Sequence, residues 1–274
     1  MRDWFGRVGG EGRRSGALAG VLGAALGLVA IGGPALAQDA WEEVAGLQVV
    51  HADATLPLAR IFDSPDFRHQ LIVTDAGGFV LDLKSKSVSA LPVDAITWDD
   101  QDLPAPDMTM AEELGLFLNE EGILSFQGDD GTYVVQPEPP LVGEISADKL
   151  RAAKPDYVHA ASKYEPNKAM IAAISGVKTP TTIKVFFGTW CSYCKHWLPP
   201  LMKTVEAAKN PAIQLEFVGM SEDQSEPADL LGQYDVSLTP TFVILQNGEE
   251  VGRFEEEPLV SVEADLARYL GVEP

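Results

Sequence analysis

Only two cysteines occur in this chain of 274 residues, and Cys191 and Cys194 are separated by just two positions. The preceding residues 182–187 are mainly β-branched and aromatic, which predicts a buried strand. Residues 195–208 are compatible with a helix. The cysteines therefore lie where a strand meets a helix N-terminus, where unpaired N–H groups and the helix dipole stabilise a thiolate. This placement is what thiol–disulfide exchange requires.

Other uses of a Cys-x-x-Cys pair fit the sequence less well. A structural disulfide here would close a very small loop and gain little chain entropy. A zinc site lacks ligands, because the chain has four histidines and no second cysteine pair. Haem attachment needs histidine directly after the second cysteine, where Lys195 stands and His196 comes one position late. We therefore expect no metal and no organic cofactor, since the Cys191–Cys194 disulfide itself carries electrons.

The N-terminal residues 1–37 have the pattern of a signal peptide. Residues 17–33 are uncharged and rich in small and aliphatic side chains, and Ala35 and Ala37 fit the small-x-small cleavage pattern. The basic residues before this stretch are Arg2, Arg7, Arg13 and Arg14. We expect cleavage after Ala37 and a periplasmic or otherwise extracytoplasmic location. Retention of the segment as a membrane anchor is the alternative.

The charge of the chain restricts its partners. The formal net charge is -21 at pH 7. Coulomb repulsion makes nucleic acid and anionic membrane surfaces poor partners. Membrane contact is expected only through residues 1–37, if they are retained.

Residues 38–136 are predicted to form a smaller β-rich domain. Apolar runs at 71–74 and 79–83 flank a glycine-containing turn, which indicates a hairpin. Three further strands are expected at 115–119, 123–127 and 132–136, and a loop at 98–107. His51 and His69 are isolated and are interpreted as ordinary histidines. Residues 137–144 are rich in proline, which favours a stiff linker before a second domain at 145–274.

The second domain has a mixed α/β pattern. Ser146 can cap a helix over 147–153, and Pro166 and Gly176 bracket another. The expected elements that follow are a strand at 182–187, the cysteine helix, a strand at 213–219, a helix at 227–233, a hairpin of strands 241–246 and 250–254, and a helix at 262–270.

This order of elements, with Trp-Cys-x-x-Cys-Lys at the first long helix, resembles the thioredoxin superfamily over residues 145–274. Pro199 stands five residues after Cys194, where thioredoxins have a proline in this helix. Residues 234–241 resemble the segment that carries the family's cis-proline, here Pro240. The resemblance implies a thioredoxin-like fold, with a central mixed sheet flanked by helices, and protein disulfide oxidoreductase activity.

The resemblance also implies roles for individual residues. Cys191 is expected to be the nucleophile and Cys194 the resolving cysteine. The backbone of Thr239, before Pro240, is expected to pair with a bound substrate segment. The supporting positions are Trp190, which is expected to shield the disulfide and contact substrate, Tyr193, which is expected to tune the site, and Lys195 as a further tuning residue. His196 is a tuning residue if it faces the pair; the preferred interpretation is a polar residue on the helix flank.

Several positions depart from the family pattern. Val185 replaces the buried aspartate that thioredoxins use for proton transfer. Glu216 is either a substitute proton relay or a partner of Lys184. Residues 255–257 are three glutamates where the family has a glycine after the hairpin. Thr239 resembles some periplasmic isomerases, whereas residues 217–223 resemble membrane-linked reducing thioredoxins, so the direction of electron flow stays open.

We therefore expect an exported thiol–disulfide oxidoreductase that exchanges its Cys191–Cys194 pair with protein thiols and disulfides. A membrane or periplasmic redox partner is expected to recharge it. The alternative is a non-catalytic thioredoxin-like module that binds a partner or senses redox state. A metallochaperone is a weaker form of that alternative, because copper chaperones of this fold use a spacing one residue longer.

Overall fold

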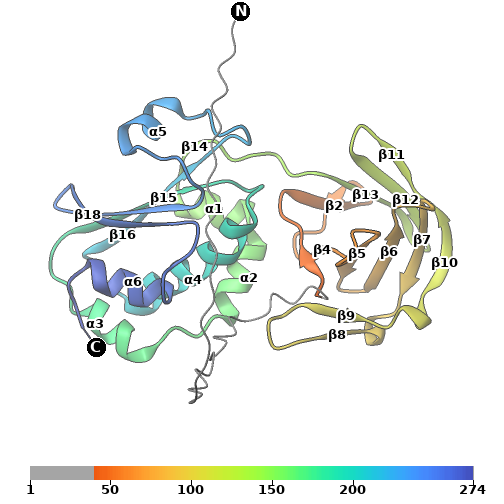
Figure 1. Cartoon of the computed structure of the whole chain (residues 1–274), viewed down its shortest axis with the longest axis horizontal. Helices are drawn as coiled ribbons and strands as arrows, with labels where there is room; N and C mark the ends of the chain where they lie inside the picture. Colours follow the sequence, from red (N-terminus) through yellow and green to blue (C-terminus); the bar gives the residue numbers. More distant parts are fainter. Residues whose placement is uncertain (1–39, 274) are drawn as a thin grey trace, which may run out of the picture. The chain divides into compact units, whose positions relative to one another are not determined.

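A computed structural model describes residues 40–273 (Figure 1). The predicted signal segment, residues 1–37, lies outside the described residues. Within the part of the chain that the structure describes, no helix is long and apolar enough to cross a membrane.

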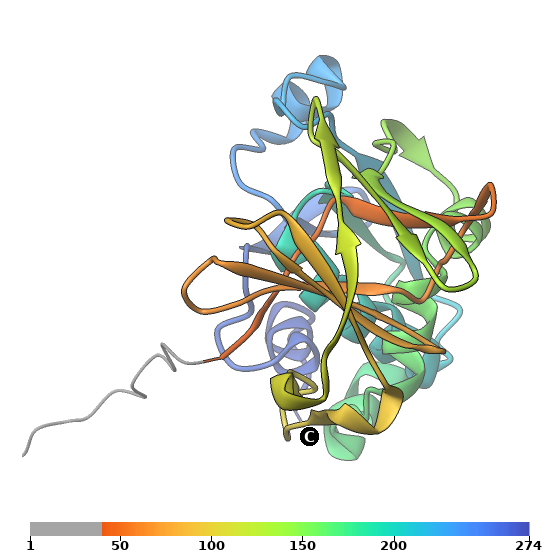
Figure 2. The same cartoon turned by 90° about the vertical axis from the view of Figure 1, so that its right-hand side faces the viewer.

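The N-terminal part of the described chain is built from antiparallel strands (Figure 2). One sheet contains, in spatial order, β1 (Glu42–Glu43), β4 (Arg60–Asp63), β5 (His69–Thr74), β6 (Gly77–Asp82), β7 (Ser87–Leu91) and β10 (Glu112–Leu116). A second sheet contains β11 (Leu118–Glu120), β12 (Ile123–Gly128), β13 (Gly131–Pro137), β2 (Leu47–His51) and β3 (Ala54–Thr55). The predicted β-rich character of this part is confirmed.

The two sheets share one apolar core. Strand residues alternate between the two faces of a sheet, so every second side chain can point into that core. Ile72 and Phe79 from the first sheet pack in the same cluster as Phe126 and Val135 from the second. The Phe79 and Phe126 rings lie 5.0 Å apart between centroids. The opposite face of the first sheet buries Phe62 and Leu71 in a separate cluster.

Two sequence predictions in this part need correction. The strand predicted at 115–119 is divided between β10 and β11, which belong to different sheets. The division occurs at Phe117, which is buried in the shared core, and the pairing register of β10 shifts before Gly115. The loop predicted at 98–107 contains strand residues, because β8 (Ile96–Trp98) pairs with β9 (Pro104–Pro106). Two short 3-10 helices, η1 (Val93–Ala95) and η2 (Met108–Met110), flank that pair.

The C-terminal part is organised around a five-stranded mixed sheet. Its strands are, in spatial order, β14 (Gly143–Ile145), β16 (Ile213–Gly219), β15 (Thr181–Phe187), β17 (Thr241–Gln246) and β18 (Glu249–Glu255). β15 is parallel to β16 and antiparallel to β17. The helices are α1 (Ala147–Ala153), α2 (Pro155–Lys163), α3 (Lys168–Ser175), α4 (Ser192–Ala208), α5 (Ala228–Tyr234) and α6 (Val262–Tyr269).

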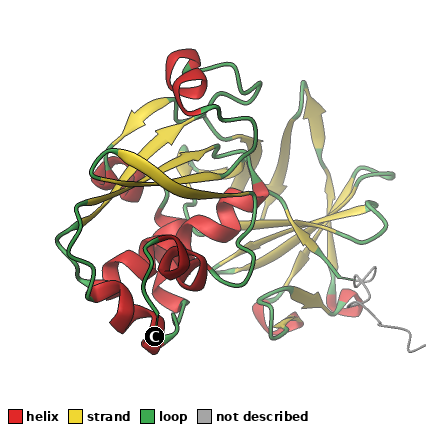
Figure 3. Ribbon diagram, turned by 60° about the vertical axis from the view of Figure 1, so that its left-hand side comes forward, coloured by secondary structure: helices red, strands yellow, loops and turns green. Residues whose placement is uncertain are grey.

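Helices cover both faces of this sheet (Figure 3). Ile183, Val185 and Phe187 of β15 point to one face and share a core with residues of α1, α2, α3, α4 and α6. Phe186 points to the other face and packs with Leu231 of α5. This arrangement is the thioredoxin-like fold that the sequence predicts for the C-terminal part.

The region from the predicted linker to the third helix differs from the expected one in three ways. The strand β13 continues to Pro137 and β14 begins at Gly143, so the predicted linker is shortened from both sides. A helix that the sequence analysis missed, α2, begins directly after α1 with Pro155 in its first turn. The helix predicted between Pro166 and Gly176 starts at Lys168, because the side chain of Asn167 caps it and leaves Pro166 outside.

The core around α4 supports a stability prediction. Leu198 lies one turn after Cys194 and is fully buried in the core under the sheet. We expect Leu198→Ala to lower the free energy of unfolding by about 2–5 kcal/mol, because it removes buried methyl groups and leaves a cavity. Urea denaturation measures this change.

Glu206→Ala is the matched control on the same helix, since Glu206 is exposed. It should change the free energy of unfolding by no more than about 0.5 kcal/mol. Equal effects of the two substitutions would contradict the assignment of this helix face to the core.

Candidate functional site

The two cysteines lie at the junction of β15 and α4. Cys191 is the N-cap residue of α4, and its sulfur accepts a hydrogen bond from the backbone N–H of Cys194 at 3.3 Å. The Cys194 sulfur lies one turn inside the helix and accepts a hydrogen bond from the Gly188 N–H at 3.4 Å. Both cysteines are free thiols and both are buried, Cys194 completely.

The surroundings give the two thiols opposite acidities. Hydrogen bonding from the Cys194 thiol is the largest effect on Cys191 and lowers its pKa, with help from the backbone N–H groups of Tyr193 and Cys194 and against the effect of burial. Burial raises the pKa of Cys194 well above its usual value. Cys191 is therefore the thiol that ionises first, and Cys194 stays protonated. This asymmetry suits a nucleophile followed by a resolving thiol.

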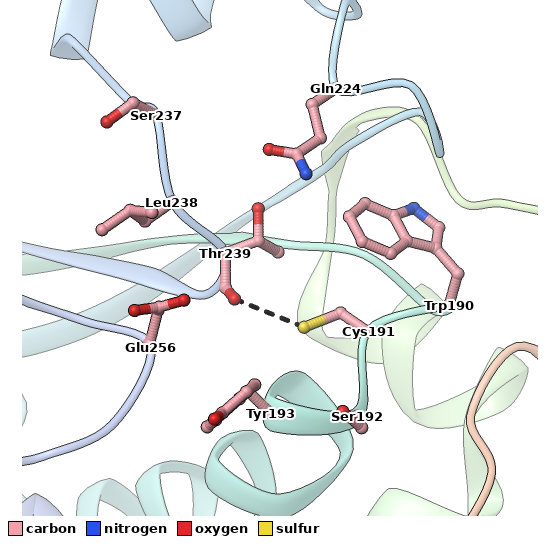
Figure 4. Close-up of a pocket in the computed structure, with 9 residues that line it drawn as sticks. All are labelled: Trp190, Cys191, Ser192, Tyr193, Gln224, Ser237, Leu238, Thr239 and Glu256. Carbon is pink, nitrogen blue, oxygen red and sulfur yellow. Dashed lines mark hydrogen bonds between the residues drawn. The ribbon is translucent and has the colours of Figure 1, made fainter.

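The loop before β17 lies against the Cys191 sulfur. The Thr239–Pro240 peptide bond is cis. The Cys191 thiol donates a hydrogen bond to the Thr239 carbonyl oxygen at 3.4 Å (Figure 4). The Thr239 hydroxyl is turned away and donates to the sulfur of Met220 at 3.5 Å. The Thr239 backbone therefore faces the reactive sulfur directly.

A pocket of about 280 Å³ opens at this point. Its lining residues are Trp190, Cys191, Ser192, Tyr193, Gln224, Ser237, Leu238, Thr239 and Glu256 (Figure 4). Tyr193 and Leu238 expose 47% and 39% of their surfaces, so the rim offers apolar contact area beside the sulfur. Gln224 is a lining residue that the sequence analysis did not single out, and it belongs to no motif that could have indicated it. Glu256 was noted there only as one of three glutamates that depart from the family pattern, not as a residue of the site.

Trp190 is held in place from two sides. Its indole N–H donates to the Met220 carbonyl at 3.4 Å, and the ring lies so close to Gly188 that a side chain there would collide with it. Gly46, which precedes β2 and has φ +77°, approaches the Trp190 backbone, and a Cβ at Gly46 would lie 2.9 Å from the Trp190 Cα. The β-rich part therefore packs directly on the redox loop.

Lys195 is paired with a carboxylate from the β-rich part. Its ammonium group lies 2.9 Å from the carboxylate of Glu43. Arg60 donates two hydrogen bonds of 2.9 Å to the same carboxylate. Burial opposes ionisation of Glu43, but the hydrogen bonds from Arg60 and the charges of Lys195 and Arg60 outweigh it and lower the pKa of Glu43.

His196 and Glu216 do not face the cysteine pair. The His196 ring packs edge-on against Trp197, with 4.4 Å between centroids. Loss of hydration lowers the pKa of His196, so its ring is neutral near pH 7 despite the nearby negative charges of Glu43 and Glu257. His196 therefore contributes no positive charge to the thiols at that pH.

Glu216 forms an ion pair with Lys184, with 2.8 Å between the nitrogen and the nearer oxygen. The two residues are paired across β16 and β15, on the sheet face opposite Val185 and Cys194. The idea of Glu216 as a proton relay to the cysteines is therefore wrong, and its pairing with Lys184 is confirmed. Glu216 and the cysteines lie on opposite faces of the sheet because side chains alternate between the two faces along a strand.

A tyrosine that the sequence analysis missed lies near the thiols. Tyr157 of α2 is buried in the same core cluster as Cys191 and Cys194. Its hydroxyl has no hydrogen-bond partner within the described residues. Burial raises the pKa of Tyr157 well above its usual value, and a Cys194 thiolate is the next largest cause. Because α2 itself was not predicted, no sequence signal placed Tyr157 here.

The described residues 40–273 contain no group of three or more His, Cys, Asp or Glu side chains arranged to hold a metal ion. Around the two thiols the structure places Trp190, Tyr193, Thr239 and Pro240.

Comparison with known proteins gives a family for this site. The family model described as Thioredoxin matches residues 154–269. A thioredoxin of Echinococcus granulosus is 33% identical over 95 residues, which cover 35% of this chain and 81% of that protein. Thioredoxin H5 of Oryza sativa subsp. japonica is 34% identical over 73 residues, which cover 27% of this chain and 50% of that protein.

A protein disulfide-isomerase of Ricinus communis is 31% identical over 86 residues, which cover 31% of this chain and 17% of that protein. The chain thus spans most of the first of these relatives, half of the second and a small part of the third. Together they support a thiol–disulfide oxidoreductase.

The Glu43 cluster predicts a pH-dependent contribution to stability. Because the pKa of Glu43 is lower in the folded state, its contribution is complete above the unfolded pKa of about 4.3 and is lost as the pH falls through the folded pKa. Glu43→Gln should lower the free energy of unfolding at pH 7 by about 1–3 kcal/mol, because it weakens hydrogen bonds to two cations.

The difference between wild type and Glu43→Gln should shrink as the pH falls below about 4. Denaturant titrations at a series of pH values measure it. Glu42→Gln serves as the control, since Glu42 is exposed. A difference that is constant with pH, or equal for the two variants, would refute the ionic role of Glu43.

Proposed function

Because the chain belongs to the thioredoxin family, we propose that it is an exported protein disulfide oxidoreductase that exchanges its Cys191–Cys194 dithiol or disulfide with partner proteins. One observation carries this proposal. The sulfur with the lowered pKa, at the N-cap of α4, faces a pocket, and a second sulfur with a raised pKa lies buried beneath it.

The reductive half of the cycle begins when the Cys191 thiolate attacks a partner disulfide. A bond forms between Cys191 and one partner sulfur, and the other partner sulfur leaves as a thiolate. The Cys194 thiolate then attacks Cys191, forms the Cys191–Cys194 disulfide and releases the second partner sulfur. The reverse sequence oxidises a partner dithiol.

The partner segment binds in the pocket beside the reactive sulfur. The Thr239 backbone offers its N–H and carbonyl to an extended segment that aligns along it. Trp190, Tyr193 and Leu238 supply apolar contact surface around the segment. The segment's cysteine is thereby directed at the Cys191 sulfur.

The predicted signal segment supports a site of action outside the cytoplasm. In that compartment a membrane or periplasmic redox partner would restore the pair after each turnover. The reduction potential of the pair determines the direction of electron flow. A value near about −270 mV would mark a reductant, and a value between about −180 and −120 mV would mark an isomerase or oxidase.

Cysteine variants test the proposal. We expect the mature protein to catalyse insulin reduction by dithiothreitol, and Cys191→Ser to abolish this activity because it removes the nucleophile. Cys194→Ser should accumulate a mixed disulfide with the substrate, since the resolving thiol is absent. Turbidity measures the first effect and non-reducing electrophoresis the second.

Tyr164→Phe is a suitable control, because its hydroxyl donates to Glu263, away from the cysteines. It should leave the turnover rate unchanged. Full activity of Cys191→Ser would refute the nucleophile assignment. Inactivity of the wild type, with partner binding retained in the double cysteine variant, would favour a non-catalytic binding module instead.

A further inference from the structure

Glu256 occupies an unusual position beside the nucleophile. It directly follows β18, and its backbone N–H donates to the Pro240 carbonyl at 2.7 Å. The Glu257 N–H donates back to the Glu255 carbonyl at 2.7 Å, so the chain turns tightly at Glu256 with φ +58°. This left-handed conformation is unfavourable for a residue with a Cβ and is most easily adopted by glycine. A strained residue held next to a reactive centre suggests a function for its side chain.

The carboxylate of Glu256 is the charged group of the pocket. Among the nine lining residues it alone carries a formal charge near pH 7 when the thiols are protonated (Figure 4). The two flanking glutamates lie beside other groups. A carboxylate oxygen of Glu255 lies 3.8 Å from a guanidinium nitrogen of Arg253, and Glu257 lies near His196. Lys195, the adjacent cation of the motif, is paired with Glu43. No ion pair within residues 40–273 neutralises Glu256.

This charge works against the thiolate. The negative charge of Glu256 raises the pKa of Cys191, although other effects lower it overall. A cation brought by a partner would pair with Glu256 and remove this repulsion at the same time. An anionic partner would be repelled twice, by Glu256 and by the thiolate.

Resting on the proposed function, we propose that Glu256 selects partner segments with a lysine or arginine close to the reactive cysteine. The segment lies along Thr239, its sulfur faces Cys191, and its basic side chain reaches the Glu256 carboxylate at the pocket edge. The substrate class is therefore a disulfide or thiol in a basic extended segment.

Short peptides whose single cysteine is a mixed disulfide with thionitrobenzoate test this selection. The Cys191 thiolate attacks the peptide sulfur, forms the protein–peptide disulfide and releases thionitrobenzoate, which is coloured. Three peptides differ only in a lysine, glutamine or glutamate two positions from the cysteine. The second-order rate constant of release is measured for each.

We expect the wild type to react with the lysine peptide roughly three- to tenfold faster than with the glutamate peptide, and the ratio to fall as salt is added. Glu256→Gln should reduce the preference to the smaller part that the thiolate alone supplies, whereas Glu257→Gln should keep it in full. Equal rates for the three peptides, or an undiminished preference in Glu256→Gln, would overturn the inference. Failure of the wild type to react with any peptide would instead overturn the proposed function.

A second observation concerns the buried thiol. Val185 stands where thioredoxins have a buried carboxylate, so the core around Cys194 lacks that proton-transfer group. Three buried hydroxyls have no partner within the described residues, those of Tyr157, Thr189 and Thr204. The Tyr157 side chain is fully buried and belongs to the same core cluster as Cys191 and Cys194. An unsatisfied buried hydroxyl is destabilising and calls for an explanation.

The surroundings keep Tyr157 protonated and therefore a donor. The groups around it are the two thiols, Asp156, Glu138 and Lys154. The Lys154 ammonium lies 4.9 Å from the Tyr157 ring centroid and forms ion pairs with Glu138 at 2.8 Å and Asp156 at 3.2 Å. The negative groups disfavour a tyrosinate, so the hydroxyl stays a neutral donor in the core cluster that also contains Cys194.

We infer that the Tyr157 hydroxyl donates a hydrogen bond to the Cys194 sulfur when that sulfur becomes a thiolate. Tyr157 is thus a positioning residue for the second step of exchange. In that step the Cys194 proton passes to solvent, the Cys194 sulfur bonds to Cys191, and the partner sulfur leaves with the electron pair and takes up a proton from solvent.

Reaction of the reduced protein with dithiobis-nitrobenzoate separates the two steps. The first thionitrobenzoate is released when Cys191 attacks, and the second when Cys194 resolves the mixed disulfide. Tyr157→Phe should slow the second release about tenfold or more and leave the first unchanged. The control is Thr204→Val, which removes another buried and unpartnered hydroxyl, near the other end of α4.

The thermal stability of Tyr157→Phe should equal or exceed that of the wild type, because an unsatisfied hydroxyl is removed without loss of volume. Slower resolution without loss of stability is a result that a purely structural tyrosine would not give. An unchanged second phase, or equal slowing by Thr204→Val, would overturn the inference.

Discussion

The burial of Cys194 beneath Cys191 is the constraint around which the site is built. A thiol without access to water resists ionisation, so Cys194 stays protonated and its S–H donates to the sulfur above it. That donation, with the N–H groups at the start of α4, favours the thiolate on Cys191. The buried position of Cys194 depends on the apolar packing of β15 and α4. Val185, Phe187 and Leu198 belong to the same core cluster as Cys194.

The β-rich part contributes to this site through contacts rather than through reactive groups. Glu43 neutralises Lys195, and Gly46 lies against the backbone of Trp190. Glu138, from the segment that joins the two sheet systems, holds Lys154 at the start of α2. Residues far apart in sequence thus fix both ends of the redox loop and the helix that carries Tyr157.

Much of this arrangement could be predicted from the sequence, because its signals are local. The strand signal before Cys191, the cap at Ser146 and the hairpin of strands 241–246 and 250–254 each depend on neighbouring residues, and the structure contains all three. The contacts of Glu43, Glu256 and Tyr157 could not be predicted, because tertiary packing brings them to the cysteines. The sequence also could not show which face of the sheet Glu216 occupies. The alternation of side chains along a strand is evident from the sequence, but the face to which each set points depends on what packs against each side of the sheet.

Because Gly46 lies close to Trp190, the C-terminal part cannot be separated from the β-rich part without changing the surroundings of the site. A fragment beginning at residue 143 would keep the five-stranded sheet, its helices and both thiols. It would lack the backbone that braces Trp190 and the carboxylate that occupies Lys195, so its indole and ammonium groups would be free to take up other positions. The catalytic properties of such an excised fragment would therefore describe a different local environment from that of the intact chain.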